Sequence, residues 1–454
     1  MKESRQNSYA IGGGAFGDEG KGKFTDTIAT ELHNNKHPLT VYRVNGGANA
    51  GHTLEFDGKR IALHQIPCGA FIDNATVVLG KGMVLHPRDL LEEITQVKEN
   101  SNNKISSSIK IDSMATLALD THRAYEGVLK KFQTGSSGAT GRGISPAYAD
   151  IILRQPVCMR DLQRQDWEKF GQHYDLYSKQ ISGLGEDITS VQVATLNGKK
   201  IKVGTKDEFI NRLKEDREQL LPFIEDIYDY VRTTWSNEKN AYVFEMAQAI
   251  GLDSRWGFYP DVTASDTTFN AITASTEAIV DFREIEHRIS TIKATYMSSV
   301  GRRVLPTAMI GKDEELANKI REDAREYGAT TKRPRDIAFL DIPALEFYQR
   351  VSGGNEIAIT HMDIVYPDTP IKICTGYEID GKSVNYRPDQ EYLDKVTPKY
   401  IELSTWDQKR ISLATTLGEI SSEAKDYIEF ISRNLNCPVT MISNGPRREQ
   451  IIRI

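Results

Sequence analysis

Short runs of β-branched and other apolar residues alternate with longer amphipathic stretches along the chain. This alternation is typical of strands joined by crossover helices in a largely parallel sheet. The expected strands cover residues 9–12, 40–44, 76–79, 109–111, 294–298, 338–340, 356–360, 371–377 and 439–442. Several of them end at a glycine or a polar cluster, where the ligands of open parallel sheets usually bind.

Helices are expected at residues 23–34, 87–99, 206–233, 313–327 and 421–435. Asn197-Gly198 lies between two β-prone runs and predicts a hairpin. The polar residues 98–108 predict a surface loop. The pattern therefore predicts an α/β fold with a large, mostly parallel sheet flanked by helices. Because nothing in it requires a second domain, we expect one domain over residues 1–454, with loop and hairpin insertions.

Composition narrows the class of protein. The chain has 454 residues, 39% of them hydrophobic, so it can bury a large core. Its net charge of -6 argues against the basic face of a nucleic-acid or membrane-surface protein, although a local basic pocket stays open. The 4 cysteines are widely spaced, without a C-x-x-C pair, which favours a reducing compartment. With no signal peptide or long apolar run, we expect a cytoplasmic protein that binds neither nucleic acid nor membranes.

The most informative stretch is GGGAFGDEGKGKFTD, residues 12–26. A glycine-rich turn between a strand and a helix points backbone N–H groups at one spot, which suits a phosphate. Gly17 to Lys23 match the pattern G-x-x-x-x-G-K, but Phe24 replaces the Ser or Thr that would hold Mg²⁺. Asp18 is therefore the candidate for binding Mg²⁺ or taking a proton. The competing interpretation is an ordinary turn with solvated charges, which Lys21 and Lys23 make less favourable.

A second glycine cluster, VNGGANAGHT, covers residues 44–53. Its glycines would allow close approach of another anionic or sugar-bearing ligand. A single histidine is more often structural, but His52 lies inside the glycine turn, and the ordinary histidine pKa near 6.5 suits proton donation at neutral pH. We therefore interpret His52 as a candidate acid, with Asn49 as a polar neighbour.

Two further loops carry clustered donors. In SSGATGRGISPAYADIILR, residues 136–154, Thr140 and Arg142 could bind phosphate. In GATTKRPR, residues 328–335, two threonines and two arginines form a compact set of donors. Guanidinium groups bind carboxylates bidentately, so this loop favours an acidic co-substrate, and a solvated basic loop is the alternative.

Taken together, GDEGKGK, NAGHT, GATGRGISPAY, FYPDVTASDTT, GATTKRPR, THMD and SNGP resemble, in order and spacing, the motifs of adenylosuccinate synthetases. The resemblance covers almost the whole chain. It implies a core fold similar to that of P-loop NTPases and a homodimer. It also implies that the chain uses GTP and Mg²⁺ to join IMP with L-aspartate, giving adenylosuccinate, GDP and phosphate.

The resemblance also implies roles for individual residues. Asp18 matches the base that removes the purine N1 proton and binds Mg²⁺, to which Gly51 is also expected to contribute. His52 matches the acid beside the purine O6, Lys21 a catalytic lysine, and Gln248 the residue that reads the purine. The loop residues expected to hold the GTP phosphates are Gly17, Glu19, Gly20, Gly22 and Lys23.

The remaining expected contacts are with the substrates. Arg154 matches the arginine that reaches IMP in the neighbouring subunit, and Asp363 matches the acid that selects guanine. The other positions are Asn49, Ala50, Thr140, Thr263 and Arg335 for the nucleotides, Thr330, Thr331 and Arg333 for the aspartate loop, Val300 for substrate, and Ser443 and Gly445 for the guanine pocket.

The chain departs from the family pattern at Ala48, Ala249, residues 303–308, Lys332 and His361. Most of these positions line the purine or aspartate pockets, while Asp18 and His52 are kept. The chemistry is therefore expected to be conserved, with the purine left open. One rival substrate is dGMP, as in viral relatives that are typically shorter and lack the loop Asp. A rival of another class is a non-catalytic nucleotide sensor, which would need neither Asp18 nor His52.

Overall fold

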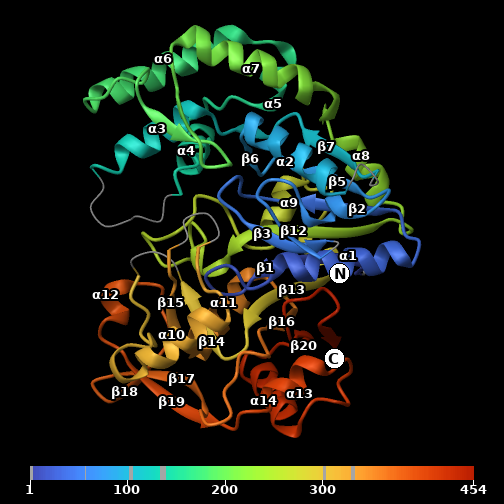
Figure 1. The fold of residues 1–454 in the computed structure, drawn as a ribbon, viewed down its shortest axis with the longest axis vertical. Helices are drawn as coiled ribbons and strands as arrows, with labels where there is room; N and C mark the ends of the chain where they lie inside the picture. The colour runs from blue at the N-terminus through green and yellow to red at the C-terminus, as the bar shows by residue number, and fades with distance from the viewer. Residues whose placement is uncertain (1–3, 57, 102–105, 133–139, 300–302, 329–332) are drawn as a thin grey trace.

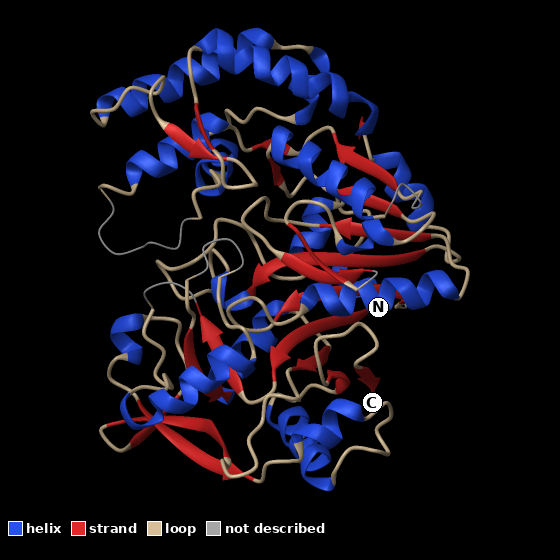
Figure 2. Cartoon of the chain, viewed as in Figure 1, coloured by secondary structure: helices blue, strands red, loops and turns tan. Residues whose placement is uncertain are grey.

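The computed structural model describes residues 4–56, 58–101, 106–132, 140–299, 303–328 and 333–454. A ten-stranded sheet crosses the middle of the molecule, with helices on both of its faces (Figures 1 and 2). Its strands follow the order β11-β7-β5-β2-β12-β1-β13-β16-β20-β21, and neighbours are parallel except for β20 and β21. The predicted fold class is confirmed.

The ten strands differ in length, and the longest lie at the centre. Their bounds are β11 Ile224–Glu225, β7 Ser108–Asp112, β5 Thr76–Leu79, β2 Leu39–Arg43, β12 Ala241–Ala249, β1 Arg5–Gly13, β13 Ile285–Lys293, β16 Glu356–Thr360, β20 Val439–Ser443 and β21 Ile451–Arg453. In register, Ala10 of β1 lies opposite Phe244 of β12 and Arg288 of β13.

A second sheet lies below the first in Figure 1. It contains β14 Tyr296–Ser299, β15 Asp336–Asp341, β17 Ile371–Ile379, β18 Lys382–Val384 and β19 Thr397–Leu403. The remaining short strands pair as β3 His52–Phe56 with β4 Lys59–Leu63, β6 Val84–Leu85 with β8 Thr116–Leu117, and β9 Gln192–Ala194 with β10 Lys200–Lys202.

Helices cover both sheets, and α6 and α7 lie at the far end from the second sheet (Figure 1). The helices are α1 Lys21–Asn34, α2 Pro87–Asn100, α3 Asp120–Leu129, α4 Ile144–Ile152, α5 Met159–Arg164, α6 Trp167–Gly183, α7 Lys206–Leu220, α8 Tyr228–Trp235, α9 Asn270–Ser275, α10 Glu314–Asp323, α11 Ile342–Ser352, α12 Gln390–Leu393, α13 Gln408–Leu413 and α14 Ser422–Asn434. None of the described helices is both long enough and apolar enough to cross a membrane.

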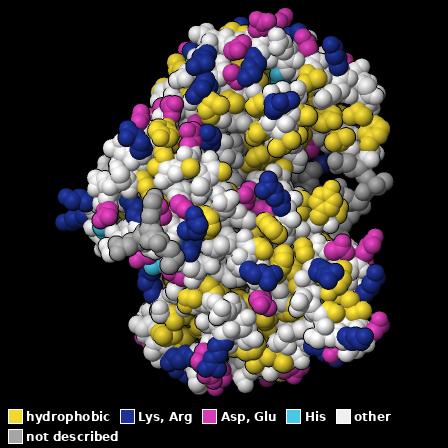
Figure 3. All heavy atoms as spheres, turned by 180° about the vertical axis from the view of Figure 1, so that it is seen from behind, with side chains coloured by type: hydrophobic (Ala, Val, Ile, Leu, Met, Phe, Trp, Pro, Cys, Tyr) yellow, Lys and Arg dark blue, Asp and Glu magenta, His cyan; other side chains and the backbone are white. Residues whose placement is uncertain are grey.

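Two large apolar clusters lie in the core. One contains side chains of α1, α2, α6, β2, β5 and β12, and the other contains side chains of α11, α14, β13, β16 and β20. Acidic and basic side chains are interspersed over the face seen in Figure 3.

Each predicted strand coincides with an observed strand, although the one predicted at 294–298 begins two residues later and belongs to the second sheet. The hairpin at Asn197-Gly198 is confirmed as β9–β10. The single helix predicted at 206–233 is wrong, because α7 ends at Leu220, just before Pro222, and a short strand separates it from α8. The predicted bounds of the loop at 98–108 are wrong, because residues 98–100 belong to α2 and residue 108 begins β7. Residues 102–105 lie outside the described residues.

Asp341 caps α11 where β15 ends, and its side chain is buried. Its carboxylate accepts the backbone N–H of Ala344 at 3.2 Å and the hydroxyl of Tyr377. Burial raises the pKa of Asp341 to about 6, and the Tyr377 hydrogen bond only partly offsets that effect. The folded protein therefore binds a proton at Asp341 more tightly than the unfolded chain does.

We predict that Asp341→Asn becomes more stable relative to the parent protein as pH rises from 4 to 7, by about 2–3 kcal/mol. The sign follows because a raised carboxyl pKa gives stability that is present at low pH and lost as pH rises through the folded-state value. Asparagine is an equally good helix cap and does not ionise. Urea unfolding at several pH values measures the difference. Asp166→Asn, at the exposed cap of α6, is the matched control, and an equal pH trend in both variants would contradict the prediction.

Candidate active site

The glycine-rich loop is shaped by close backbone approach where β1 leaves the sheet. A Cβ on Gly13 would lie 2.5 Å from the Cβ of Ala249, and one on Gly20 would lie 2.8 Å from Cγ2 of Thr360. Gly20 also has a φ of 78° and forms the N-cap of α1 without a side-chain hydrogen bond. The first N–H groups of α1 are therefore presented by a backbone that no larger residue could form, which suits a phosphate.

Asp18 lies on this loop with a φ of 61° and a side chain that is 47% exposed. Its carboxylate forms an ion pair with Nη2 of Arg335. Desolvation of the carboxylate tip opposes ionisation, but Arg335 and Lys293 together outweigh it and lower the pKa of Asp18. Asp18 is thus an ionised oxygen donor at the open side of the loop, as a base or an Mg²⁺ ligand must be.

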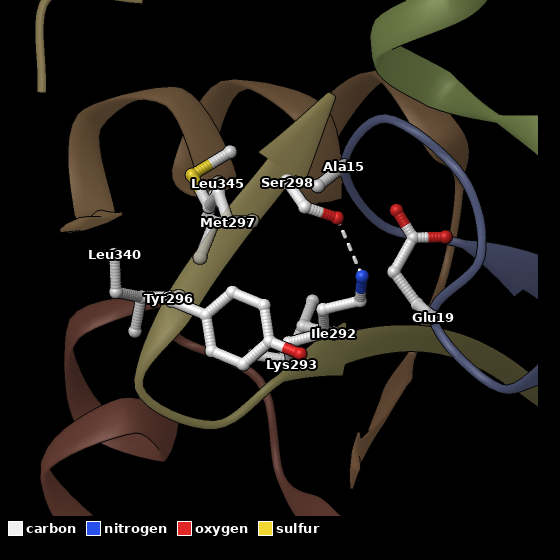
Figure 4. Close-up of a pocket in the computed structure, with 9 residues that line it drawn as sticks. All are labelled: Ala15, Glu19, Ile292, Lys293, Tyr296, Met297, Ser298, Leu340 and Leu345. Atoms are coloured by element: carbon white, nitrogen blue, oxygen red, sulfur yellow. Dashed lines mark hydrogen bonds between the residues drawn. The ribbon is translucent and has the colours of Figure 1, made fainter. Parts of the chain in front are cut away.

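Glu19 and Lys21 are buried beneath the same loop. Oε1 of Glu19 accepts the backbone N–H of Gly17 at 2.6 Å, and Oε2 lies 3.5 Å from Nζ of Lys21. Oε2 has no hydrogen-bond partner within the described structure. Figure 4 shows Glu19 across a small cavity from Lys293, whose ammonium donates to Ser298 Oγ at 2.6 Å. Glu19 therefore shapes the loop from inside.

Lys23 joins the loop helix to the predicted guanine pocket. Its ammonium donates to Ser443 Oγ at 2.7 Å, to the Gly445 carbonyl at 2.6 Å and to the Gln450 carbonyl at 3.0 Å. Burial raises the pKa of Asp363, and the positive charge of Lys23 partly offsets the rise. The structure thus brings together Lys23, Asp363, Ser443 and Gly445, with Lys23 bonded to Ser443 and Gly445.

His52 begins β3 and is buried between Arg43 and Glu245. His52 Nδ1 contacts Oε1 of Glu245 and lies 2.6 Å from Nη1 of Arg43, so both charged side chains hold this ring nitrogen. The same oxygen accepts from Nη1 of Arg43, and Oε2 accepts the backbone N–H of Cys68 at 2.8 Å. Burial and the Arg43 charge lower the pKa of His52 to about 4, against the opposing effect of Glu245. The ring is therefore neutral near neutral pH, unlike the ordinary histidine on which the sequence analysis relied.

Gln248 lies between the two glycine turns, at the end of β12. It has a φ of 57°, its Oε1 accepts the Ser265 hydroxyl at 3.3 Å, and its buried Nε2 has no hydrogen-bond partner among the described residues. Gly46 lies so close that a Cβ there would be 3.3 Å from Nε2. Asn49 Oδ1 accepts the backbone N–H of Gly47 at 3.2 Å, so Asn49 closes the second turn. An unpaired buried amide at this point is what a purine ligand would satisfy.

Other predicted residues lie apart from this group. Arg154 is exposed at the end of α4 and, in the described structure, forms no ion pair or side-chain hydrogen bond with the loop residues. Arg142 is buried and donates to the carbonyls of Ala194 and Thr195, at 3.3 and 2.9 Å, so it braces the β9–β10 hairpin. The suggestion that Arg142 binds phosphate is therefore not supported. Val300, Thr330 and Thr331 lie outside the described residues, whereas Thr140, Thr263 and Arg333 are described loop residues.

Among the described residues, two buried groups have the donor types of a metal site, and hydrogen bonds account for both. His52, Cys68 and Glu245 belong to the cluster above. His122, Asp150 and His173 form the other, in which His122 Nε2 is 3.0 Å from Asp150 and His173 Nε2 is 2.8 Å from Thr121 Oγ1. Neither offers the oxygen-rich surroundings that Mg²⁺ prefers. The loop at Asp18 fits Mg²⁺ better, because a partly exposed carboxylate lies on the loop that leads into the first turn of α1.

Sequence reasoning missed the charged partners that orient Asp18 and His52. Glu245 and Arg43 are separated by 202 positions, and Glu245 stands inside the apolar run YVFEMA of β12. A lone acid in such a run was the available signal. Glu326, which binds Arg335, and Lys293, which binds Glu326, gave no local signal.

These observations define an α/β enzyme with a glycine-rich loop at the end of a central strand of its sheet. The sequence model of the adenylosuccinate synthetase family matches residues 10–452. Adenylosuccinate synthetase of Clostridium botulinum strain Eklund 17B is 33% identical over 455 residues, covering 99% of each chain. That of Picrophilus torridus is 35% identical over 443 residues, covering 96% of this chain and 97% of the relative.

Solved structures agree. The fully ligated adenylosuccinate synthetase from Plasmodium falciparum has a TM-score of 0.83 at 29% identity, covering 99% of this chain and 100% of that one. Cyanophage S-2L succinoaminodeoxyadenylate synthetase bound to dGMP and dATP has a TM-score of 0.60 at 16% identity, covering 100% of this chain and 96% of that one, which shows a shared fold alone. The chain belongs to the adenylosuccinate synthetase family, whose members are ligases that form a carbon–nitrogen bond.

The buried cluster around Glu245 generates a stability prediction. Glu245→Gln should lower the free energy of unfolding by about 3–5 kcal/mol, because it leaves the buried Arg43 charge without its carboxylate. Glu277→Gln is the matched control, since Glu277 pairs with Lys81 at 2.7 Å on the surface, and it should cost at most about 1 kcal/mol. Urea unfolding of both variants measures the difference. An equal loss of unfolding free energy in the two variants would contradict the buried Arg43–Glu245 ion pair.

Proposed function

We propose that the protein joins L-aspartate to IMP with GTP as phosphoryl donor, giving adenylosuccinate, GDP and phosphate. Family membership supports this reaction. The observation that carries it is the placement of two glycine turns after β1 and β2, the strands on either side of β12. One turn presents Asp18, the other leads to His52, and Gln248 of β12 lies between them. An acid, a histidine and a purine-reading amide thus face one carboxyl edge of the sheet.

In the first step, the N–H groups of the loop and Lys21 hold the GTP phosphates. Asp18 removes the N1 proton of IMP as O6 bonds to the γ-phosphorus, and the bond from that phosphorus to the bridging oxygen of GDP breaks. Mg²⁺, held by Asp18 and the Gly51 carbonyl, would neutralise the charge that moves. The product of this step is 6-phosphoryl-IMP.

In the second step, the aspartate amine attacks C6, its proton is lost, and phosphate leaves with the former O6. Arg333 is the described member of the loop proposed to hold the aspartate carboxylates, and Thr330 and Thr331 complete it. His52 acts at Nε2, since Nδ1 is bound to Glu245. A phosphoryl group beside the ring would add negative charge, which favours the protonated form that burial and the Arg43 charge disfavour.

Asp363 is proposed to accept the guanine N1–H and N2–H₂ donors, which adenine lacks. Ser443 and Gly445 would form the opposite wall, and Lys23 links that wall to the loop. Thr140, Asn49, Ala50, Thr263 and Arg335 are proposed to contact the nucleotides. Selection for GTP would therefore depend on one carboxylate at the end of β16.

IMP is favoured over dGMP as the acceptor. Ala48 and Ala249, the substitutions that raised the alternative, are both fully buried. Ala249 packs against Gly13 of the loop, where it supports the backbone instead of opening space for an exocyclic amine. Retention of Asp18 and His52 together also disfavours a non-catalytic sensor.

We further propose a homodimer in which Arg154 reaches the partner's active site. The three residues before it, Ile151, Ile152 and Leu153, are 39%, 81% and 61% exposed. Adjacent exposed apolar side chains suit a surface that another subunit covers.

We also propose that residues 1–454 form one domain, because strands from both ends of the chain build the central sheet. We propose that the enzyme works in the cytoplasm, where its unpaired cysteines stay reduced.

Asp18→Asn should retain GTP binding and lose at least about 100-fold in turnover, because an amide cannot take the purine proton. Phosphate release under saturating substrates measures turnover, and calorimetry with GTP measures binding. Unchanged turnover would contradict the role assigned to Asp18, and lost GTP binding would show that the variant fails for another reason.

The purine is tested by incubating the protein with GTP, Mg²⁺, aspartate and either IMP or dGMP. We expect adenylosuccinate from IMP, with a rate from dGMP at least about 100-fold lower, as for a site built around one set of polar groups. A rate confined to dGMP would overturn the choice of purine. GTP binding without turnover on either purine would favour the sensor.

A further inference from the structure

Glu326, just beyond α10, collects four donors around one buried carboxylate. Oε1 accepts from Lys293 Nζ and from the Tyr296 hydroxyl at 2.6 Å. Oε2 accepts from Ser298 Oγ at 2.9 Å and from Arg335 Nη1 at 2.8 Å. The side chain is 1% exposed. Both oxygens are therefore fully used, and the carboxylate has little freedom to move.

The hydrogen-bond directions in this network are determined. Tyr296 has one hydroxyl hydrogen and donates it to Glu326, which can only accept. Nδ1 of His361, 2.5 Å from the same hydroxyl oxygen, must therefore be the donor in that bond. The network thus continues from Glu326 through Tyr296 to His361, two residues before the proposed guanine-binding Asp363.

Arg335 links this network to the glycine-rich loop. Its Nη1 is bound to Glu326, and its Nη2 is paired with Asp18. A guanidinium is planar and rigid, so fixing one nitrogen fixes the direction in which the other points. Glu326 is held by four donors, whereas Asp18 is partly exposed. The fixed position of Glu326 therefore sets the direction of the Arg335 guanidinium, and with it the position of the Asp18 carboxylate.

The charges explain how Asp18 could leave Arg335 during the reaction. Lys293 and Arg335 are balanced by Glu326 and Asp18 in the structure. When Asp18 turns to a purine or a metal, Arg335 still keeps Glu326, so no buried cation is left alone. Without Glu326, Arg335 would have Asp18 as its remaining carboxylate partner and would hold it more tightly.

We infer that Glu326 is a positioning residue which, through Arg335, places the Asp18 carboxylate and allows its release to the substrates. This inference rests on the proposed function of Asp18. It assigns to Glu326 no contact with substrate.

The test is a double-mutant cycle on turnover, measured as phosphate release with GTP, Mg²⁺, IMP and aspartate. Glu326→Gln alone should lose about 30-fold in turnover, within the range for misplacing a proton-transfer group. Asp18→Asn should lose at least about 100-fold in the parent protein but less than about 10-fold in the Glu326→Gln background, because residues acting as a unit are not additive. An undiminished loss in that background would overturn the inference.

His52→Asn is the matched comparison, since His52 is held by Glu245 in a separate cluster. Its loss should be the same in both backgrounds, and a collapse of the His52 effect as well would show a general defect and overturn the inference. If Asp18→Asn has no effect even in the parent protein, the proposed function of Asp18 fails, which is a different outcome.

Two further variants guard against a folding artefact. Glu326→Gln combined with Lys293→Met restores the charge balance and is used in the same cycle if the single variant unfolds. Glu356→Gln removes another partly buried carboxylate, which binds His287 and Thr440. Glu356 is the first residue of β16, at the end of that strand away from His361. This variant should leave turnover unchanged, and a loss equal to that of Glu326→Gln would attribute the effect to stability and contradict the inference.

Discussion

The close approach of β1 to its two neighbours is the constraint on which the site depends. A Cβ on Gly13 would meet Ala249 of β12, and a Cβ on Gly14 would lie 2.7 Å from Cγ2 of Ile292 of β13. Only a chain without side chains at these positions can leave the sheet there and turn into α1. This turn places the N–H groups of α1, Asp18 and Lys21 at one point, so the chemistry follows from a packing requirement of the backbone.

A buried charge cluster supports the site on each side of this turn. From β2 and β12, Arg43 and Glu245 hold His52, and from β13 and the segment before β15, Lys293 and Arg335 share Glu326. Burying charges is costly unless each is paired, so such clusters are poor stabilisers of a fold. These clusters instead fix the orientation of side chains, because a fully paired carboxylate keeps its partners in one position. The two side chains proposed for proton transfer are each held by one of these clusters.

The sequence predicted the fold class and the glycine loops well, because glycine turns and β-branched runs are local signals. The strands β12 and β13, which flank β1, were missed. Both interrupt their apolar runs with charged residues, Glu245 in one and Glu286, His287 and Arg288 in the other. Glu245 is one of the residues that the site uses, so the element hardest to recognise is the one that carries function. Asp18 and His52 could be proposed from their loops. Glu245 offered only the signal of a lone acid in an apolar run, because its partner Arg43 lies 202 positions away, and Glu326 offered no local signal.

Oxygen transfer tests the central claim most directly, because the account requires the purine oxygen to capture the terminal phosphoryl group of GTP. IMP labelled with ¹⁸O at position 6 is converted in the presence of GTP, Mg²⁺ and aspartate, and the phosphate released is analysed by mass spectrometry. The account predicts one ¹⁸O atom in each phosphate formed. Unlabelled phosphate formed alongside adenylosuccinate would contradict it.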